Sequence, residues 1–263
     1  MLIDGRWVDA VGGDRFPTVD PECGVELATV PQARSADVDL AVRAAGRAVR
    51  AGSPWRTMAA AGRGRLLRRI SDLVLENGEE LALVASMDDG RPVTFARYAD
   101  VPMAAQLFRH MADRADRVVR APIGVVGQIL PRHSPLLMAV WRLAPALAAG
   151  CAVVLKPAGD TPLPALWIAE LVQQAGVPDG VVNVLTGDHH TGRALITHQG
   201  VDAVAFTGSA ETGQAIATLA AAHPRPVLLE VGGNAPDVVH GGGDLAHALA
   251  GPMGDELLRD YLR

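Results

Sequence analysis

Short, continuously apolar runs alternate with longer helical patterns over the second half of the chain. The helical patterns carry apolar residues three and four positions apart, whereas the short runs are rich in β-branched residues and end at glycine, proline or polar residues. Such alternation predicts βαβ units, and continuous rather than alternating hydrophobicity predicts strands that are covered on both faces. The predicted strands are residues 124–130, 152–155, 181–185, 203–206, 226–230 and 237–239. We therefore expect an α/β fold, an open parallel sheet with helices on both faces.

Residues 1–119 have a different pattern, with short extended pieces followed by helices. Asp4-Gly5 favours a two-residue hairpin turn within residues 2–8. The predicted division is an N-terminal region of residues 1–119 packing on residues 120–245, a Rossmann-like dinucleotide-binding part. An atypical tail of residues 246–263 follows.

Composition narrows the class of protein. Half of the 263 residues are apolar (49%), and the formal charge of −5 gives no reason to expect a nucleic-acid partner. No apolar run reaches the roughly 20 residues needed to span a bilayer, so no membrane partner is expected. Two distant cysteines and an N-terminus without a signal-peptide pattern favour a reducing, cytoplasmic location.

Two elements of residues 120–245 could bind phosphate or ribose. Residues 208–213 follow a strand and open a helix, where Gly208 allows close backbone approach and Ser209 can cap the helix or bind a phosphate. Lys156 ends another strand, so its cation would project from the carboxyl edge of the sheet. The alternatives are a plain strand-to-helix turn for the first element and a solvated lysine for the second.

Glu230 and three histidines are the other candidates. Glu230 ends an apolar strand before two glycines, so it could serve as a general base or simply cap backbone N–H groups. His133 lies at another strand end, and His189 and His190 form a pair in a loop. None of them has a third ligand at metal spacing, so no metal site is predicted.

These residues, taken in order, resemble the aldehyde dehydrogenase superfamily over residues 1–245. The matching pieces are Ile3-Asp4-Gly5-Arg6-Trp7, Asp89-Gly90-Arg91-Pro92, Gly124-Val125-Val126-Gly127-Gln128-Ile129, Pro145-Ala146-Leu147-Ala148-Ala149-Gly150, Val154-Leu155-Lys156-Pro157-Ala158, Gly180-Val181-Val182-Asn183-Val184, Phe206-Thr207-Gly208-Ser209 and Leu229-Glu230-Val231-Gly232-Gly233.

The resemblance implies NAD(P)-dependent oxidation of an aldehyde to a carboxylic acid. In that family a cysteine attacks the carbonyl, hydride passes to the nicotinamide, and a glutamate activates the water that releases the acyl group. Carried over, Lys156 would hold the adenosine ribose, Gly208 and Ser209 the pyrophosphate, and Glu230 would be the base. The other residues that the resemblance assigns to the cofactor are Ile129, Pro157, Gly187 and Gly213.

The chain also departs from the family pattern. No cysteine follows Cys151, which aligns with a structural strand start, so the nucleophile and the catalytic domain are missing. His133 stands where the family has the asparagine that helps to hold the oxyanion, with Arg132 in place of a tryptophan. Gly159 replaces the carboxylate that binds the ribose hydroxyls, which should make NADP tolerable as well as NAD.

The family's oligomerisation arm is also largely missing. We therefore expect an aldehyde dehydrogenase-like chain, truncated before the catalytic cysteine, that binds NAD or NADP and is inactive alone. Its partner could be a full-length aldehyde dehydrogenase or a separate catalytic half. The alternatives are a non-catalytic dinucleotide-binding or interaction subunit and a truncated gene product. The sequence gives no indication of the aldehyde.

Overall fold

A seven-stranded sheet organises the molecule, in the strand order β2-β1-β7-β6-β5-β8-β9. The computed structural model describes residues 1–116, 118, 120–223, 225–231 and 258–262. The five described strands of this sheet that follow residue 120 run parallel to one another, which confirms the predicted α/β class. They are β5 (Val125–Ile129), β6 (Ala152–Lys156), β7 (Val182–Val184), β8 (Ala203–Gly208) and β9 (Val227–Val231).

The N-terminal hairpin extends this sheet rather than packing beside it. β1 (Leu2–Ile3) pairs with β2 (Arg6–Trp7) and, through Leu2 and Val184, runs antiparallel to β7. The predicted turn is present, with positive φ angles of 52° at Asp4 and 72° at Gly5. The sheet is therefore mixed at one edge. A separate two-stranded sheet is made by β3 (Arg15–Val19) and β4 (Glu26–Pro31).

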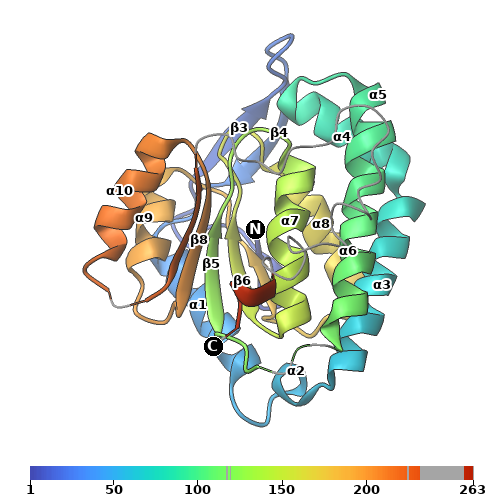
Figure 1. Cartoon of the computed structure of the whole chain (residues 1–263). Helices are drawn as coiled ribbons and strands as arrows, with labels where there is room; N and C mark the ends of the chain where they lie inside the picture. The colour runs from blue at the N-terminus through green and yellow to red at the C-terminus, as the bar shows by residue number, and fades with distance from the viewer. Residues whose placement is uncertain (117, 119, 224, 232–257, 263) are drawn as a thin grey trace.

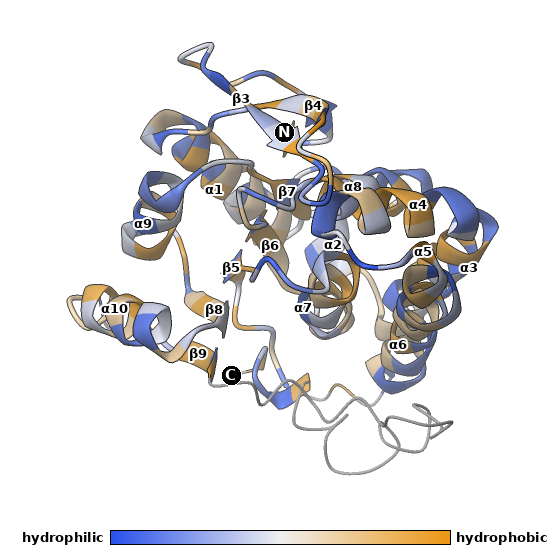
Figure 2. Ribbon diagram, turned by 90° about the horizontal axis from the view of Figure 1, so that it is seen from above, coloured by the Kyte–Doolittle hydropathy of each residue, from blue (hydrophilic) through white to orange (hydrophobic). Residues whose placement is uncertain are grey.

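Helices cover both faces of the large sheet (Figures 1 and 2). One face packs against α1 (Ser35–Val49), α9 (His189–Thr197) and α10 (Ala210–Ala220), and the other against α7 (Pro135–Ala149) and α8 (Leu163–Gln174). An outer layer follows beyond α7 and α8, formed mainly by α3 (Ala60–Glu76), α4 (Gly78–Asp89) and α6 (Val101–Ala115). The short α2 (Pro54–Thr57), α5 (Val93–Phe95) and η1 (Ala96–Asp100) connect these elements.

Helix α7 lies between the sheet and the outer helices, and all of its residues are buried. A helix in that position must be apolar on every side, because no face of it meets water. The one ionisable residue among its fifteen is Arg142, which is 2% exposed. A buried arginine needs partners for its donors, and these partners define part of the site described below.

Some expectations need correction or fall outside the described residues. The last helical stretch of residues 1–119 is not one regular helix, because a π-helical turn, η1, lies between α5 and α6, and α6 ends at Ala115. The strand predicted over 237–239 lies outside the described residues. Of the predicted tail, residues 258–262 are described, and Leu258 and Tyr261 are buried. No helix in the described part of the chain could span a membrane.

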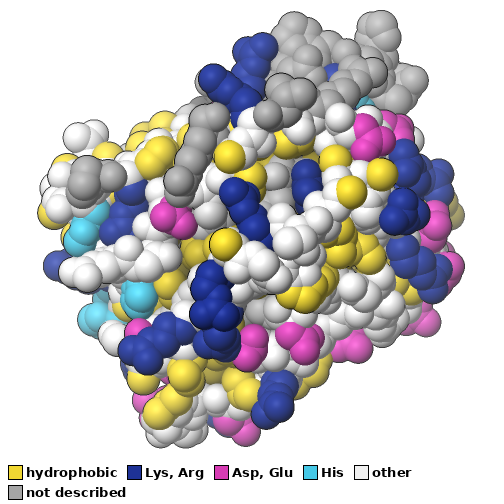
Figure 3. All heavy atoms as spheres, turned by 90° about the horizontal axis from the view of Figure 1, so that it is seen from below, with side chains coloured by type: hydrophobic (Ala, Val, Ile, Leu, Met, Phe, Trp, Pro, Cys, Tyr) yellow, Lys and Arg dark blue, Asp and Glu magenta, His cyan; other side chains and the backbone are white. Residues whose placement is uncertain are grey.

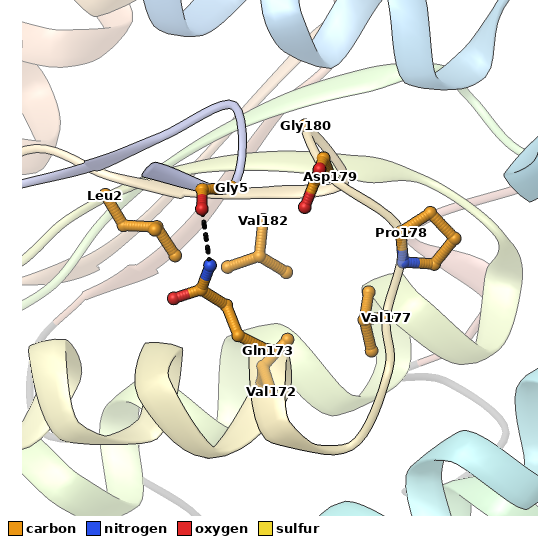
Figure 4. Close-up of a pocket in the computed structure, with 9 residues that line it drawn as sticks. All are labelled: Leu2, Gly5, Val172, Gln173, Val177, Pro178, Asp179, Gly180 and Val182. Carbon is orange, nitrogen blue, oxygen red and sulfur yellow. Dashed lines mark hydrogen bonds between the residues drawn. The ribbon is translucent and has the colours of Figure 1, made fainter. Parts of the chain in front are cut away.

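A cavity of about 10 Å³ lies between the N-terminal hairpin and α8, where Gln173 Nε2 donates to the Gly5 carbonyl (2.8 Å; Figure 4). Its volume is that of about one water molecule, so it is a small packing cavity and too small for a ligand. It also lies at the amino end of β7 (Figure 4). The face of the molecule seen in Figure 3 carries basic side chains interspersed with hydrophobic and acidic ones.

Candidate functional site

The predicted site residues meet along the carboxyl edge of four neighbouring parallel strands. In the sheet register Ile129 of β5 lies opposite both Lys156 of β6 and Phe206 of β8. One step further along, Thr207 of β8 lies opposite Glu230 of β9. Residues that are up to 101 positions apart therefore form one continuous row. This edge is where open α/β sheets bind ligands.

Lys156 is not a solvated strand-end lysine. Its side chain is 6% exposed, and its Nζ donates to the carbonyl of Pro157 (3.0 Å). Burial lowers the pKa of Lys156 to about 8, and the charges of Asp188 and Asp160 oppose that shift. It is also the only lysine of a chain that has 23 arginines. Since this carbonyl is its one hydrogen-bond partner among the described residues, the buried ammonium has donors left for a ligand.

Two glycines bring the loops beyond β6 and β7 together next to Lys156. Gly187 has a φ angle of 158°, and a Cβ at this position would overlap the hydroxyl of Thr191. That hydroxyl is itself fixed, because it donates to the Ala33 carbonyl (2.6 Å). Among the described residues, a Cβ on Gly159 would meet only the Gly187 carbonyl oxygen, at 3.6 Å. The position of the missing carboxylate is therefore open, whereas Gly187 is required by local packing.

Ser209 is the N-cap of α10, as one of the two sequence interpretations predicted. Its Oγ accepts the backbone N–H of Thr212 (3.2 Å), and the residue is exposed. The cap places the positive end of an eleven-residue helix at the carboxyl edge of β8. Capping and phosphate binding are compatible, because the first N–H groups of a helix have no partners within the helix.

The neighbouring glycines have packing reasons of their own. A Cβ on Gly208 would overlap the ring of Phe206, and a Cβ on Gly213 would overlap a methyl group of Val231. The second contact lets α10 approach β9 closely. Their places in the fold are therefore explained without a ligand, and their assignment to the cofactor stays a prediction.

Glu230 is held by three donors at the end of β9. Its Oε2 accepts from Arg142 Nη2 (3.0 Å) and from the Thr207 hydroxyl (3.2 Å), and its Oε1 faces the indole nitrogen of Trp141 at 3.4 Å. The side chain is 28% exposed, whereas that of Arg142 is 2% exposed. The carboxylate thus sits at the boundary between a buried polar network and solvent.

Arg142 is a residue that the sequence interpretation missed. Its guanidinium also donates to the Thr207 hydroxyl (Nε 3.0 Å) and to the carbonyl of Phe206 (Nη2 3.1 Å). It also hydrogen-bonds the phenol of Tyr261, to which Gln128 Nε2 donates (3.3 Å). The available indication was one arginine within the apolar pattern of residues 136–149.

His133 lies in the exposed loop between β5 and α7, next to Ser134, whose φ angle is +46°. Partial burial and the charge of Arg91 lower the pKa of His133. Within the described residues His133 makes no hydrogen bond, so the structure does not join it to Glu230. Its role at the asparagine position stays a prediction.

Neither cysteine lies at the carboxyl edge. Cys151 precedes the first residue of β6, at the opposite edge of the sheet from Lys156, and is fully buried. Burial raises the pKa of its thiol to about 11. Cys23 is exposed in the turn between β3 and β4.

The expectation that His189 and His190 have no third possible ligand nearby was wrong, because Asp188 joins them at the start of α9, with possible ligand atoms within 4.8 Å of one another. The Asp188 carboxylate is already engaged, because Oδ1 caps the N–H groups of His190 and Thr191 and Oδ2 pairs with Arg34 (3.2 Å). These contacts explain the aspartate as a helix cap.

A mostly parallel, doubly covered sheet with a capped helix and a buried lysine at its carboxyl edge has the form of a dinucleotide-binding fold. Comparison with known proteins makes the class more specific. The model of the aldehyde dehydrogenase family matches residues 7–257, and the chain belongs to that family.

Curated relatives and solved structures agree with this membership. Aldehyde dehydrogenase 1 of Tanacetum cinerariifolium is 42% identical over 265 residues, covering 94% of this chain and 53% of the relative. The mitochondrial aldehyde dehydrogenase of Homo sapiens is 40% identical, covering 95% and 52%. The NAD+ complex of a Bacillus cereus aldehyde dehydrogenase has a TM-score of 0.87 at 38% identity, covering 95% and 54%. An E. coli NADP-dependent enzyme has a TM-score of 0.85 at 35% identity, covering 89% and 51%. The chain spans about half the length of the relatives it matches.

Proposed function

We propose that this chain binds NAD or NADP along the carboxyl edge of β6, β5 and β8. The observation that carries the proposal is Lys156, the only lysine, buried at that edge with one carbonyl partner. Its ammonium would bind the adenosine ribose, and the α10 N-terminus with Ser209 would bind the pyrophosphate. Of the similar structures, the E. coli one is an NADP-dependent enzyme and the Bacillus cereus one is an NAD+ complex, which supports a nicotinamide dinucleotide as the ligand.

Tolerance of NADP is part of the proposal. A carboxylate near the ribose would repel a 2′-phosphate, and Gly159 supplies no carboxylate. Within the part of the chain that the structure describes, the space there is open, because a Cβ on Gly159 would meet only the Gly187 carbonyl oxygen. The negative charges of Asp160 and Asp188 lie near Lys156, where they raise its pKa. They would also repel a 2′-phosphate, which limits how strongly NADP can be favoured over NAD. We expect NADP to bind at a strength similar to NAD rather than to replace it.

Glu230 would be the general base in aldehyde oxidation, the reaction in which the dinucleotide accepts a hydride. Its two oxygens are unequal in this respect. Oε2 accepts from both Arg142 and Thr207, whereas Oε1 has one long contact, 3.4 Å from Trp141 Nε1. Oε1 is therefore the atom that could take a proton from a water molecule, while Oε2 keeps the carboxylate in place.

We infer that this chain by itself does not oxidise aldehydes. The family route needs a thiolate next to the base, but Cys151 is buried at the opposite edge of the sheet and Cys23 lies in the separate β3–β4 hairpin. Activity would require a cysteine from a partner, either a full-length aldehyde dehydrogenase or a separate catalytic half. The alternatives are a non-catalytic dinucleotide-binding or interaction subunit and a truncated product without a role.

Calorimetric titration of the purified chain with NAD and with NADP tests the proposal. Replacing Lys156 by Met should weaken binding by about 1–2 kcal/mol, since it removes a charge-assisted hydrogen bond. The matched control is Arg43→Met, which removes an exposed cation paired with Asp39 on α1 and should leave the affinity unchanged. Failure of both dinucleotides to bind a folded chain would refute the proposal, and turnover of an aldehyde by the chain alone would refute the inference of inactivity.

A further inference from the structure

Residues 258–262 form a segment, the C-terminal segment, that returns to the centre of the sheet. Leu262 forms an antiparallel bridge with Pro122, and the N–H of Ile123 donates to the carbonyl of Tyr261 (3.0 Å). Leu258 is 7% exposed and Tyr261 is 1% exposed. The segment is therefore attached by backbone hydrogen bonds at the start of β5 and by two buried side chains.

Tyr261 enters a slot made by three elements of the dinucleotide-binding part. Its carbonyl accepts from Cys151 Sγ (3.3 Å) and its phenol accepts from Gln128 Nε2 (3.3 Å). The same phenol hydrogen-bonds Arg142. Burial raises the pKa of Tyr261 to about 12, and the charge of Arg142 opposes the shift. The phenol is thus neutral at physiological pH and accepts hydrogen bonds from the buried polar side chains of Gln128 and Arg142.

The contacts continue from Tyr261 to the candidate base. Arg142 Nη2 pairs with Glu230 Oε2 (3.0 Å), and Arg142 Nε donates to Thr207 Oγ1 (3.0 Å). Arginine has a long, flexible stem, so a guanidinium with partners at one end only would have several orientations available. Tyr261 is a further hydrogen-bond partner of the Arg142 side chain. Gln128 Nε2 also links the two residues, because it donates both to the Tyr261 phenol (3.3 Å) and to the Arg142 carbonyl (2.8 Å).

We propose that the C-terminal segment is a docked element of this protein and that Tyr261 is a positioning residue, which orients Arg142 and through it the Glu230 carboxylate. The inference relies on the proposed function only where it calls Glu230 a base. The network itself is measured without a dinucleotide or an aldehyde, so failure of the two proposals can be distinguished.

The indole N–H of Trp141 reports on this network, because it points at Glu230 Oε1. The chain has four tryptophans, so a ¹H–¹⁵N spectrum contains four indole resonances, and Trp141→Phe assigns the relevant one. In Tyr261→Phe, which keeps the ring but removes the hydroxyl, we expect this resonance to move toward its position in Glu230→Gln. The matched control is Tyr98→Phe, the only other tyrosine and 74% exposed, which should leave it in place. An unmoved resonance in Tyr261→Phe would overturn the positioning role.

Docking of the segment is measured separately by alkylation of Cys151, with exposed Cys23 as the internal reference. In the full chain Cys151 should react at least about 100-fold more slowly than Cys23, since its thiol is buried and protonated. A variant that ends at residue 257 should react at Cys151 at least about tenfold faster than the full chain, whereas Tyr261→Phe should stay protected. Equal rates at Cys151 with and without residues 258–262 would overturn the docking.

Discussion

Replacing Arg142 by Met should destabilise the protein far more than replacing a surface arginine. The side chain is 2% exposed and donates to Phe206, Thr207 and Glu230. Methionine would fill most of the volume of the stem but would remove the hydrogen bonds that these acceptors receive from Arg142, so that among the described residues Glu230 would keep only Thr207 and Trp141 as donors. Each buried acceptor left unpaired costs about 1–3 kcal/mol, and loss of one partner of a buried ion pair costs about 3–5 kcal/mol.

The free-energy cost of leaving Glu230 without Arg142 is smaller than for a fully buried carboxylate, because its side chain is 28% exposed and water can solvate it. We therefore expect a loss of roughly 2–4 kcal/mol in the free energy of unfolding for Arg142→Met. Arg68→Met is the matched control: Arg68 pairs with Asp113 at 2.7 Å, but the two side chains are 49% and 69% exposed. That variant should lose less than about 1 kcal/mol.

Urea unfolding followed by fluorescence and circular dichroism gives both values from the midpoint and slope. A double-mutant cycle with Glu230→Gln isolates the pair, because Arg142→Met with Glu230→Gln leaves no unpaired charge. The double variant should be more stable than the sum of the single losses by about 1–2 kcal/mol. Equal losses for the Arg142 and Arg68 variants, or strict additivity in the cycle, would refute the assignment of Arg142 as the buried partner of Glu230.

Two other predictions concern buried groups outside this network. Asp88 accepts the Leu163 N–H, and burial raises its pKa to about 7 from its ordinary 3.8. The folded state therefore binds this proton more tightly than the unfolded state, so the protein loses stability as pH rises from about 4 through 7. Asp88→Asn should therefore gain roughly 1–3 kcal/mol over the parent in urea unfolding at pH 8 and little at pH 4; the same difference at both pH values would contradict this. Gly187→Ala should cost about 1–3 kcal/mol because its Cβ would overlap Thr191, whereas Gly46→Ala, within α1 with open space around it, should stabilise by up to about 1 kcal/mol; thermal unfolding in which both changes have the same sign would contradict it.

The parallel strands β5, β6, β7 and β8 were predictable because each is buried on both faces. A strand covered by helices on either side must be apolar at consecutive positions, which is a pattern that local sequence displays directly. The predicted strand over 152–155 corresponds to β6 (Ala152–Lys156), and that over 203–206 to β8 (Ala203–Gly208). The differences lie at the carboxyl ends, where Lys156 and Gly208 continue the ladder although their residue types favour a turn.

The polar network under Glu230 was not predictable in the same way. Arg142 is visible in the sequence as one charge within an apolar helix, but nothing local indicates what it faces. Its partners Thr207 and Tyr261 are 65 and 119 positions further along the chain. Only the strand order, which places β8 and β9 together, brings the first of them and Glu230 to the same arginine. A buried charge in a sequence indicates that partners exist without identifying them.

The glycines and the lysine at the carboxyl edge differ in how much their structural surroundings explain. Gly187, Gly208 and Gly213 each stand where a Cβ would overlap a neighbouring side chain, so packing alone accounts for them. Packing does not account for Lys156 in this way. Burying an ammonium costs free energy, and the hydrogen bond to one carbonyl at 3.0 Å offsets only part of that cost. Leucine or methionine would fill the same space at lower cost. A residue that destabilises the fold where it lies is better explained by a ligand than one that the fold requires, and for this reason Lys156, rather than the glycine-rich turn, is the residue on which dinucleotide binding should be tested.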